Sequence, residues 1–200
     1  MIKRIINFFI CLCLTITCVY SFDIITNATV QYDGVNINSV KQAKTNWCWA
    51  ACAEMAGKNV YSGSSRTQYS VVQHLKGTSS EKYPNATGSI SDSAKGSQYV
   101  AYNKKTFIST ASKWSFSQIG VSLRKGYAVQ AGAGYYSNGK RTGGHMVIIY
   151  GTEFIDNSSG IFYYINYIDP WDGKAHNCTY SSFCNGSYNS RKYDQTIYVS

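Results

Sequence analysis

The feature that most limits the fold of this chain is a change in residue pattern partway along its 200 residues. The run "WCWAACAEMAG" (47–57) is rich in Ala and almost continuously apolar, which predicts a buried helix. After Gly126, β-branched and aromatic runs alternate with turn sequences such as "SNGKRTGG" and "DNSSG". Helices first and an antiparallel sheet afterwards predict an α+β fold.

The element boundaries follow from turn and capping residues. We expect Asn46 to cap the first helix and Gly57 to end it. The stretch 77–98 has few apolar side chains and predicts a long surface excursion. The remaining expected elements are a short strand within 28–40, helices over 66–77 and 116–126, and strands over 127–136, 144–154, 161–171 and 193–200.

The first 21 residues have the layout of a secretory signal peptide. Two basic residues precede an apolar run that begins at Ile5, and Val19 and Ser21 fit a cleavage site before Phe22. An uncleaved anchor is the alternative, since the apolar run is near the lower length limit for spanning a bilayer. We therefore predict a secreted, extracellular or periplasmic protein with one domain over residues 22–200 and no stable membrane association after cleavage.

The charge of the chain is basic but dispersed. The whole sequence carries a net charge of +9, and removal of residues 1–21 leaves 17 basic and 10 acidic residues. Such a balance attracts acidic partners. However, the sequence has no basic helix or Arg-rich tract, so we expect the charge to serve solubility and exclude nucleic acid as a partner.

Four cysteines remain after signal removal. Cys178 and Cys184 close a short loop, which predicts a disulfide in an oxidising compartment. Cys48 and Cys52 lie four residues apart on one face of a helix, a geometry that does not favour a disulfide. Two free thiols in an exported protein require an explanation.

Cys48 is a candidate nucleophile because it opens the predicted helix. Backbone N–H groups and the macrodipole at a helix N-terminus favour a thiolate. The alternative is a small buried core residue, which is the commoner role of a free cysteine. Cys52 lies one turn further on, away from the terminal amides, and we interpret it as a core residue.

A thiolate nucleophile needs a base, and the chain has three histidines. His74 lies within a helix and His176 in a polar loop, whereas His145 follows Gly143 and Gly144 and opens the apolar strand "MVIIY". Glycine permits close approach of other backbone or of a substrate. His145 is therefore the best candidate base, with a structural hydrogen bond at a strand end as its alternative.

Two further residues complete a candidate site. Asn166 and Asp169 compete to orient the imidazole, and Asp169 is favoured because it lies at the end of its strand before Pro170. An Asp-Pro turn is its structural alternative. Gln42, six residues before Cys48, is a candidate donor to an oxyanion, together with the Cys48 backbone N–H.

In this arrangement the sequence resembles the papain-like cysteine peptidases. That family carries a Gln six residues before a Cys-Trp pair that begins the central helix, here Gln42 and Cys48–Trp49. A His opening a strand follows, here "GGHMVIIYG", and then a residue two positions before a Trp, here "DPW" with Asp169 and Trp171. The string "WCWAAC", with Asp in place of the usual Asn, is most similar to the compact bacterial branch, which includes bacteriocin-leader-processing peptidases and effector proteases.

The resemblance implies a secreted thiol peptidase without metal or organic cofactor. Its cleft would lie between a helical part and the sheet, with Trp49, Gly144 and Trp171 beside the reacting groups. We expect a monomer that acts on a protein or peptide substrate.

Three other functions are alternatives to a peptidase. An acyltransferase or a cell-wall amidase would share the Cys/His/Asp chemistry. A non-catalytic binding module would share only the fold. Metal binding through Cys48, Cys52 and a histidine is the third, although its spacing matches no usual zinc pattern.

Overall fold

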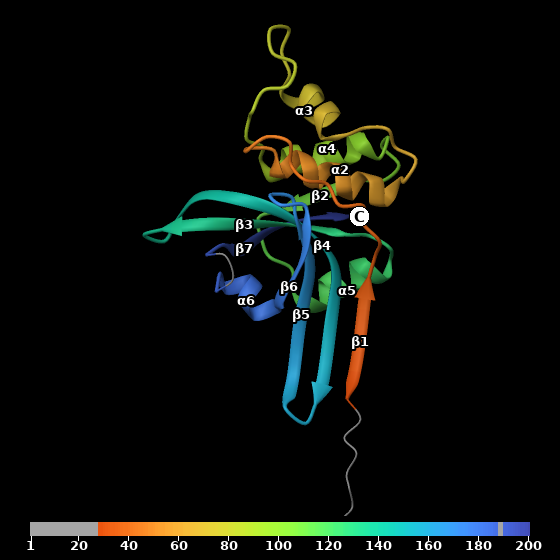
Figure 1. The fold of residues 1–200 in the computed structure, drawn as a ribbon, viewed down its shortest axis with the longest axis vertical. Coiled ribbons are helices and arrows are strands. Elements are labelled where there is room, and N and C mark those ends of the chain that lie inside the picture. The colour runs from red at the N-terminus through yellow and green to blue at the C-terminus, as the bar shows by residue number, and fades with distance from the viewer. Residues whose placement is uncertain (1–27, 188–189) are drawn as a thin grey trace, which may run out of the picture.

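The computed structural model describes residues 28–187 and 190–200 of the chain. The predicted signal peptide, residues 1–21, lies outside the described part. The architecture is α+β, as the residue pattern predicts: a seven-stranded antiparallel sheet with helices on both faces (Figure 1). The helices are α2 (Cys48–Val60), α3 (Gln68–Lys76), α4 (Ile90–Val100), α5 (Phe116–Arg124) and α6 (Tyr180–Asn185). The strands are β1 (Thr29–Gly34), β2 (Phe107–Thr110), β3 (Val129–Ser137), β4 (Lys140–Asn157), β5 (Gly160–Asp169), β6 (Lys174–Thr179) and β7 (Lys192–Val199).

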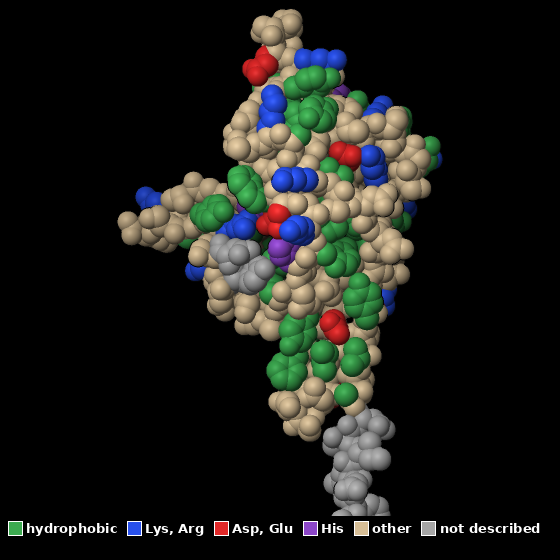
Figure 2. All heavy atoms as spheres, viewed as in Figure 1, with side chains coloured by type: hydrophobic (Ala, Val, Ile, Leu, Met, Phe, Trp, Pro, Cys, Tyr) green, Lys and Arg blue, Asp and Glu red, His purple; other side chains and the backbone are tan. Residues whose placement is uncertain are grey.

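The sheet is organised around β4, which is 18 residues long. The strand order is β2-β7-β3-β4-β5-β6, and β1 pairs with β4 outside this path. The first half of β4 pairs with β3, and the second half lies between β1 and β5. Together the three strands β1, β4 and β5 extend from the body of the molecule (Figure 1), and Figure 2 shows hydrophobic side chains gathered over this extension.

Both faces of the central sheet are covered, which explains the continuous apolar run in β4. Met146 and Ile148 pack in a core with residues of α2 and α4, whereas Val147 and Ile149 pack in a second core with residues of α5. A strand that is buried on both faces has no polar alternation. The apolar run that opens at His145 is therefore fixed in register by two cores.

The helical layer is held together by small residues. Helices α2 and α4 cross so closely that a Cβ atom on Gly57 would lie 2.4 Å from Val100 Cβ, and one on Gly96 would lie 3.0 Å from Ala53 Cβ. Gly57 was expected to end the first helix, but the helix continues to Val60. The glycine is there for close packing rather than for termination.

Two other boundaries differ from expectation. Asn46 does not cap α2: the N-cap position is Trp47, without a side-chain cap bond, and the Asn46 side chain donates to the backbone oxygen of Asn85 instead. The stretch 77–98, expected as a surface excursion, ends in helix α4, which begins after a capping box formed by Ser89 and Asp92. Its buried face consists of small residues such as Ser93 and Ala94, so it lacked the apolar periodicity of a helix.

The C-terminal part of the chain contains elements that the sequence analysis did not predict. Strands β2 and β6 and helix α6 were not expected from the sequence. Cys178 lies near the end of β6 in the core and Cys184 lies within α6, and the structure has both as free thiols rather than as the predicted disulfide. The residues between the two cysteines are the end of β6 and most of α6, so the short loop assumed for the disulfide is absent. Among the described residues, no helix is long and apolar enough to cross a membrane.

Candidate active site

Cys48 is the first residue of α2 and lies half-buried against the start of β4. Burial raises the pKa of its thiol. The hydrogen bond and charge of His145, with backbone hydrogen bonds of Met146 and Trp49, outweigh burial and set the pKa below its ordinary value. Cys52, one turn further on, is fully buried, and burial raises its thiol pKa well above the ordinary value. The two cysteines therefore differ in the way the sequence predicts.

His145 lies on β4 opposite Ala133 of β3. Its Nε2 atom is 2.5 Å from Oδ1 of Asp169, so Nδ1 is the ring nitrogen that remains for Cys48. Burial lowers the imidazole pKa, but hydrogen bonds and charges of Asp169 and Cys48 raise it above the ordinary value overall. A lowered thiol pKa beside a raised imidazole pKa favours a thiolate–imidazolium pair.

The pairing of β4 with β5 explains how Asp169 reaches His145. Ile148 lies opposite Ile168, so Asp169 comes opposite Val147 and shares a sheet face with His145 as its diagonal neighbour. Asp169 also accepts a hydrogen bond from the Trp171 backbone N–H at 2.9 Å. Burial raises the pKa of this carboxyl, but His145, the Trp171 amide and Arg191 lower it below the ordinary value overall.

Asn166, the competing candidate, lies elsewhere on β5. It is paired with Gly151 on β4, and its side-chain oxygen accepts from Asn177 at 2.8 Å. The residue that contacts His145 is therefore Asp169.

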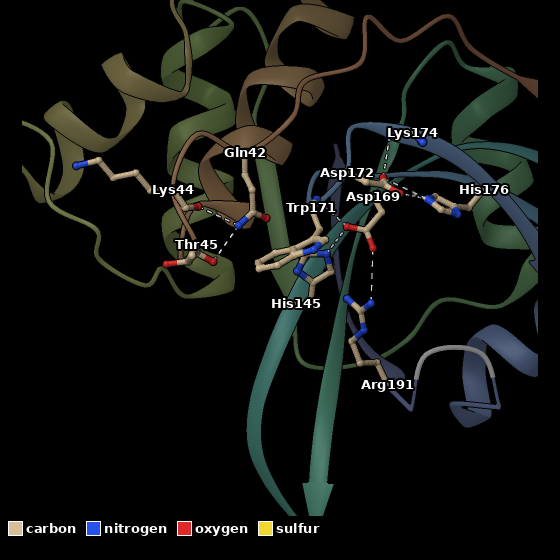
Figure 3. Close-up of polar contacts among 10 residues, drawn as sticks. All are labelled: Gln42, Lys44, Thr45, His145, Asp169, Trp171, Asp172, Lys174, His176 and Arg191. Atoms are coloured by element: carbon tan, nitrogen blue, oxygen red, sulfur yellow. Dashed lines mark hydrogen bonds and ion pairs between the residues drawn. The ribbon is translucent and has the colours of Figure 1, made fainter.

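Gln42 is buried in the loop before α2, and its amide is hydrogen-bonded within that loop. Its Nε2 atom donates to the backbone oxygens of Lys44 and Thr45, both at 2.9 Å, as Figure 3 shows. Its Oε1 atom is buried without a partner among the described residues. A primary amide has two N–H donors, and both acceptors are in its own loop, so Gln42 braces this loop. The cavity described below is not lined by Gln42.

The tryptophans on either side of Cys48 have a role that the sequence did not reveal. Trp47 Nε1 donates to the backbone oxygen of Pro84 at 2.9 Å, and Trp49 Nε1 donates to that of Ala86 at 3.1 Å. Lys44 and Asn46 bond in the same way to the oxygens of residues 83 and 85. Four consecutive carbonyls of a polar loop are thus fixed by the segment that carries Cys48. This loop was expected to be a free surface excursion, and it forms one wall of the site.

A cavity of about 390 Å³ opens beside Cys48 and His145. The expected cleft residues Trp49, Gly144 and Trp171 all line it, with Trp171 59% exposed. The other lining residues are Thr45, Asn46, Thr87, Gly88, Tyr135 and Arg191. Tyr135 and Arg191 were missed because neither belongs to a motif; the hairpin of β3 and β4 and the start of β7 bring them to the site.

The other histidines lie outside this cavity. His74 stacks on Tyr99 with ring centroids 4.1 Å apart, in keeping with a packing role. His176 lies on β6 and contacts Asp172, with Nε2 3.0 Å from Oδ2 (Figure 3). In the part of the chain that the structure describes, no three His, Cys, Asp or Glu side chains are grouped so that they could hold a metal ion.

Comparison with known proteins identifies a family whose model matches most of the chain. The model of the Peptidase_C39-like family matches residues 34–196, which include the whole site. No curated protein matches the sequence.

Proposed function

Because the chain belongs to the Peptidase_C39-like family of papain-like cysteine peptidases, we propose that it hydrolyses peptide bonds through an acyl-enzyme on Cys48. The observation that carries this proposal is the continuous contact from Cys48 through His145 to Asp169 at the edge of an open cavity. Nucleophile, base and orienting group lie in the order that covalent catalysis requires.

The first half of the reaction is acylation. The Cys48 thiolate attacks the peptide carbonyl carbon, and a tetrahedral intermediate forms. Protonated His145 then donates its proton to the leaving nitrogen, which breaks the C–N bond and releases the amine. Asp169 holds the ring through Nε2, so that Nδ1 remains directed at the reacting atoms.

The second half is hydrolysis of the thioester. Neutral His145 removes a proton from water, and the hydroxide adds to the acyl carbon. The tetrahedral intermediate then expels the Cys48 thiolate and releases the acid, which leaves the thiolate beside protonated His145. Both halves need the same imidazole in two protonation states. The opposing pKa shifts at Cys48 and His145 favour the charged pair in which the cycle begins.

The oxyanion of each tetrahedral intermediate lies at the N-terminus of α2. The Cys48 backbone N–H is one donor there, with the helix macrodipole aligned behind it. Gln42 is the second donor in this proposal. To act in this way, its amide has to release one of its bonds to Lys44 or Thr45 when the substrate binds.

The proposed setting of the reaction is outside the cytoplasm. The predicted signal peptide over residues 1–21 directs export, and the protein acts on a protein or peptide as a monomer. These parts of the proposal rest on the sequence.

Site-directed thiol labelling tests the proposed nucleophile. Purified wild-type protein and His145→Ala are treated with an epoxide inhibitor of papain-like enzymes at pH 6 to 7, and modified peptides are mapped by mass spectrometry. We expect fast labelling of Cys48 in the wild type and its loss in His145→Ala. Cys52, buried in the same helix, is the internal control. Equal labelling of Cys48 and Cys52 in both proteins would disprove the peptidase and indicate a binding module.

Product analysis then separates the reaction types. We expect shortened peptides from an unfolded protein substrate. Crosslinked products would indicate acyl transfer instead, and release of muropeptides from purified cell walls would indicate an amidase.

A further inference from the structure

Arg191 places a cation in the wall of the cavity, although no motif marks it. It directly precedes β7 and lines the cavity together with Gly144, His145 and Tyr135. Its side chain is 16% exposed, so most of it is withdrawn from water. A cation in such a position is costly unless charged or polar groups surround it.

The protein itself satisfies this cation only partly. Among the described residues, the nearest anionic atom is Oδ2 of Asp169, 3.6 Å from an Arg191 guanidinium nitrogen, which is beyond hydrogen-bond length. The guanidinium also lies 5.8 Å from the centre of the Tyr135 ring. A guanidinium has five N–H donors, and these two contacts leave most of them available. Arg191 is thus prepared for an anionic ligand that enters the cavity.

Among the described residues, Asp169 is the carboxylate that lies within 4 Å of Arg191, and its principal partner is His145. Asp169 directs Oδ1 to His145 and to the Trp171 backbone N–H. Its Oδ2 atom approaches Arg191 only to 3.6 Å, so no carboxylate among the described residues forms a hydrogen bond with the guanidinium.

The position of Arg191 relative to His145 identifies the half of the substrate that it meets. His145 has to face the leaving nitrogen, so the chain after the cleaved bond continues past His145. Arg191 lies on the Asp169 side of that imidazole (Figure 3), whereas Gly88 lies against Trp49, the residue after Cys48. The leaving-group half therefore passes Gly144, Tyr135 and Arg191.

We propose that Arg191 binds a carboxylate in the leaving-group half of the substrate. The inference rests on the proposed peptidase function and adds a preference to it. The carboxylate belongs either to an Asp or Glu side chain within the first two positions after the cleaved bond or to a free C-terminus at that distance. Arginine is suited to either source, because its planar fork matches a carboxylate in bidentate geometry.

The test uses matched pairs of peptides built around the bond that the protein cleaves fastest in denatured casein. One pair differs by Glu or Gln after the cleaved bond, and the other by a free carboxylate or an amide at a C-terminus two residues after it. The kcat/KM ratio within each pair is measured for wild type, Arg191→Gln and Lys192→Gln. Lys192 is the matched control, because it is the neighbouring cation, lies over the Tyr136 ring and does not line the cavity.

We expect the wild type to prefer the charged member of at least one pair about tenfold, as charged hydrogen bonds typically do. This ratio falls towards one in Arg191→Gln and is unchanged in Lys192→Gln. The pair that shows the preference identifies the source of the carboxylate. Thermal unfolding and the rate of Cys48 alkylation by iodoacetamide verify that Arg191→Gln keeps its fold and its active thiol.

Two outcomes would overturn the inference without touching the peptidase proposal. In the first, the wild type cleaves both members of each pair equally well. In the second, Arg191→Gln slows both members by the same factor and keeps the ratio, which would make Arg191 a positioning residue that acts through Asp169. Failure of the peptidase proposal has a different signature, since then no peptide is cleaved by any of the proteins.

Discussion

Two histidine–aspartate pairs lie near each other in this molecule, and they differ in almost everything except their chemistry. In the first, His145 Nε2 is 2.5 Å from Asp169, and both side chains are 9% exposed. In the second, His176 Nε2 is 3.0 Å from Asp172, with side-chain exposures of 25% and 37%. The first pair adjoins Cys48 and the cavity, and the second lies outside the cavity lining.

The comparison teaches that the residue pair alone does not make a site. Asp169 and Asp172 are three residues apart, one at the end of a strand and the other in the turn that follows. Asp169 is the last residue of β5 and shares a sheet face with His145, whereas Asp172 lies in the turn, four residues before its partner on β6. Burial strengthens hydrogen bonds and charge interactions in the first pair, and solvent screens them in the second.

Replacing each histidine with alanine should give the largest difference in catalytic activity between the two pairs. We expect His145→Ala to lower kcat/KM for a peptide by about 10⁵-fold, because nucleophile and base act as a unit. His176→Ala, the matched control, should keep the wild-type value within a few-fold. Steady-state kinetics with a fluorogenic peptide measures both. A comparable loss in the two variants would mean that the second pair takes part in catalysis.

Gln42 provides the next largest effect. We expect Gln42→Ala to lower kcat about 100-fold with little change in KM, the effect of losing one oxyanion donor. Its free energy of unfolding should also fall by about 1 kcal/mol, because the loop loses its brace. Kinetics and urea unfolding of the same preparation separate the two roles. A loss of stability with unchanged kcat would assign Gln42 to the loop alone.

Neutralising each aspartate tests the two pairs through the pH profile. Asp169 raises the pKa of His145, and His145 has to be protonated to expel the amine. We expect Asp169→Asn to move the alkaline limb of kcat/KM to lower pH and to reduce the maximum roughly tenfold. Asp172→Asn should leave the limb in place. An unchanged limb in Asp169→Asn would show that Asp169 does not set the protonation of the imidazole.

The free energy of unfolding should show the smallest difference between the two pairs. Asp169 has a lowered pKa, so its contribution is present above the ordinary carboxyl value of 3.8 and is lost as pH falls through the folded pKa. His145 has a raised pKa, so its contribution is full below 6.5 and is lost as pH rises through the folded value. The pair therefore stabilises most between these values.

In that pH window we expect Asp169→Asn to lower the free energy of unfolding by about 3 kcal/mol, as for a buried pair that loses one partner. Asp172→Asn should lower it by less than about 1 kcal/mol, because its pair is exposed. Urea unfolding at pH 5.5 measures both variants. Equal losses would mean that burial does not distinguish the two pairs.

The sequence by itself determined the fold class and indicated the residues of the candidate site. The change from Ala-rich to β-branched runs is local, and so is the position of Cys48 at the start of a helix. His145 could be preferred to the other two histidines because Gly144 precedes it and an apolar strand follows. Such features can be predicted from the sequence because propensity and periodicity depend on neighbouring residues.

The tertiary structure alone decided how these residues meet and what surrounds them. Strand register selected Asp169 over Asn166, and a loop contact turned the Gln42 amide towards Lys44 and Thr45. Helix α4 escaped prediction because its buried face is made of small residues that fit a close helix crossing. Arg191 lines the cavity although it is far from Cys48 and His145 in the sequence. Such features depend on contacts between segments far apart in sequence, which no local pattern encodes.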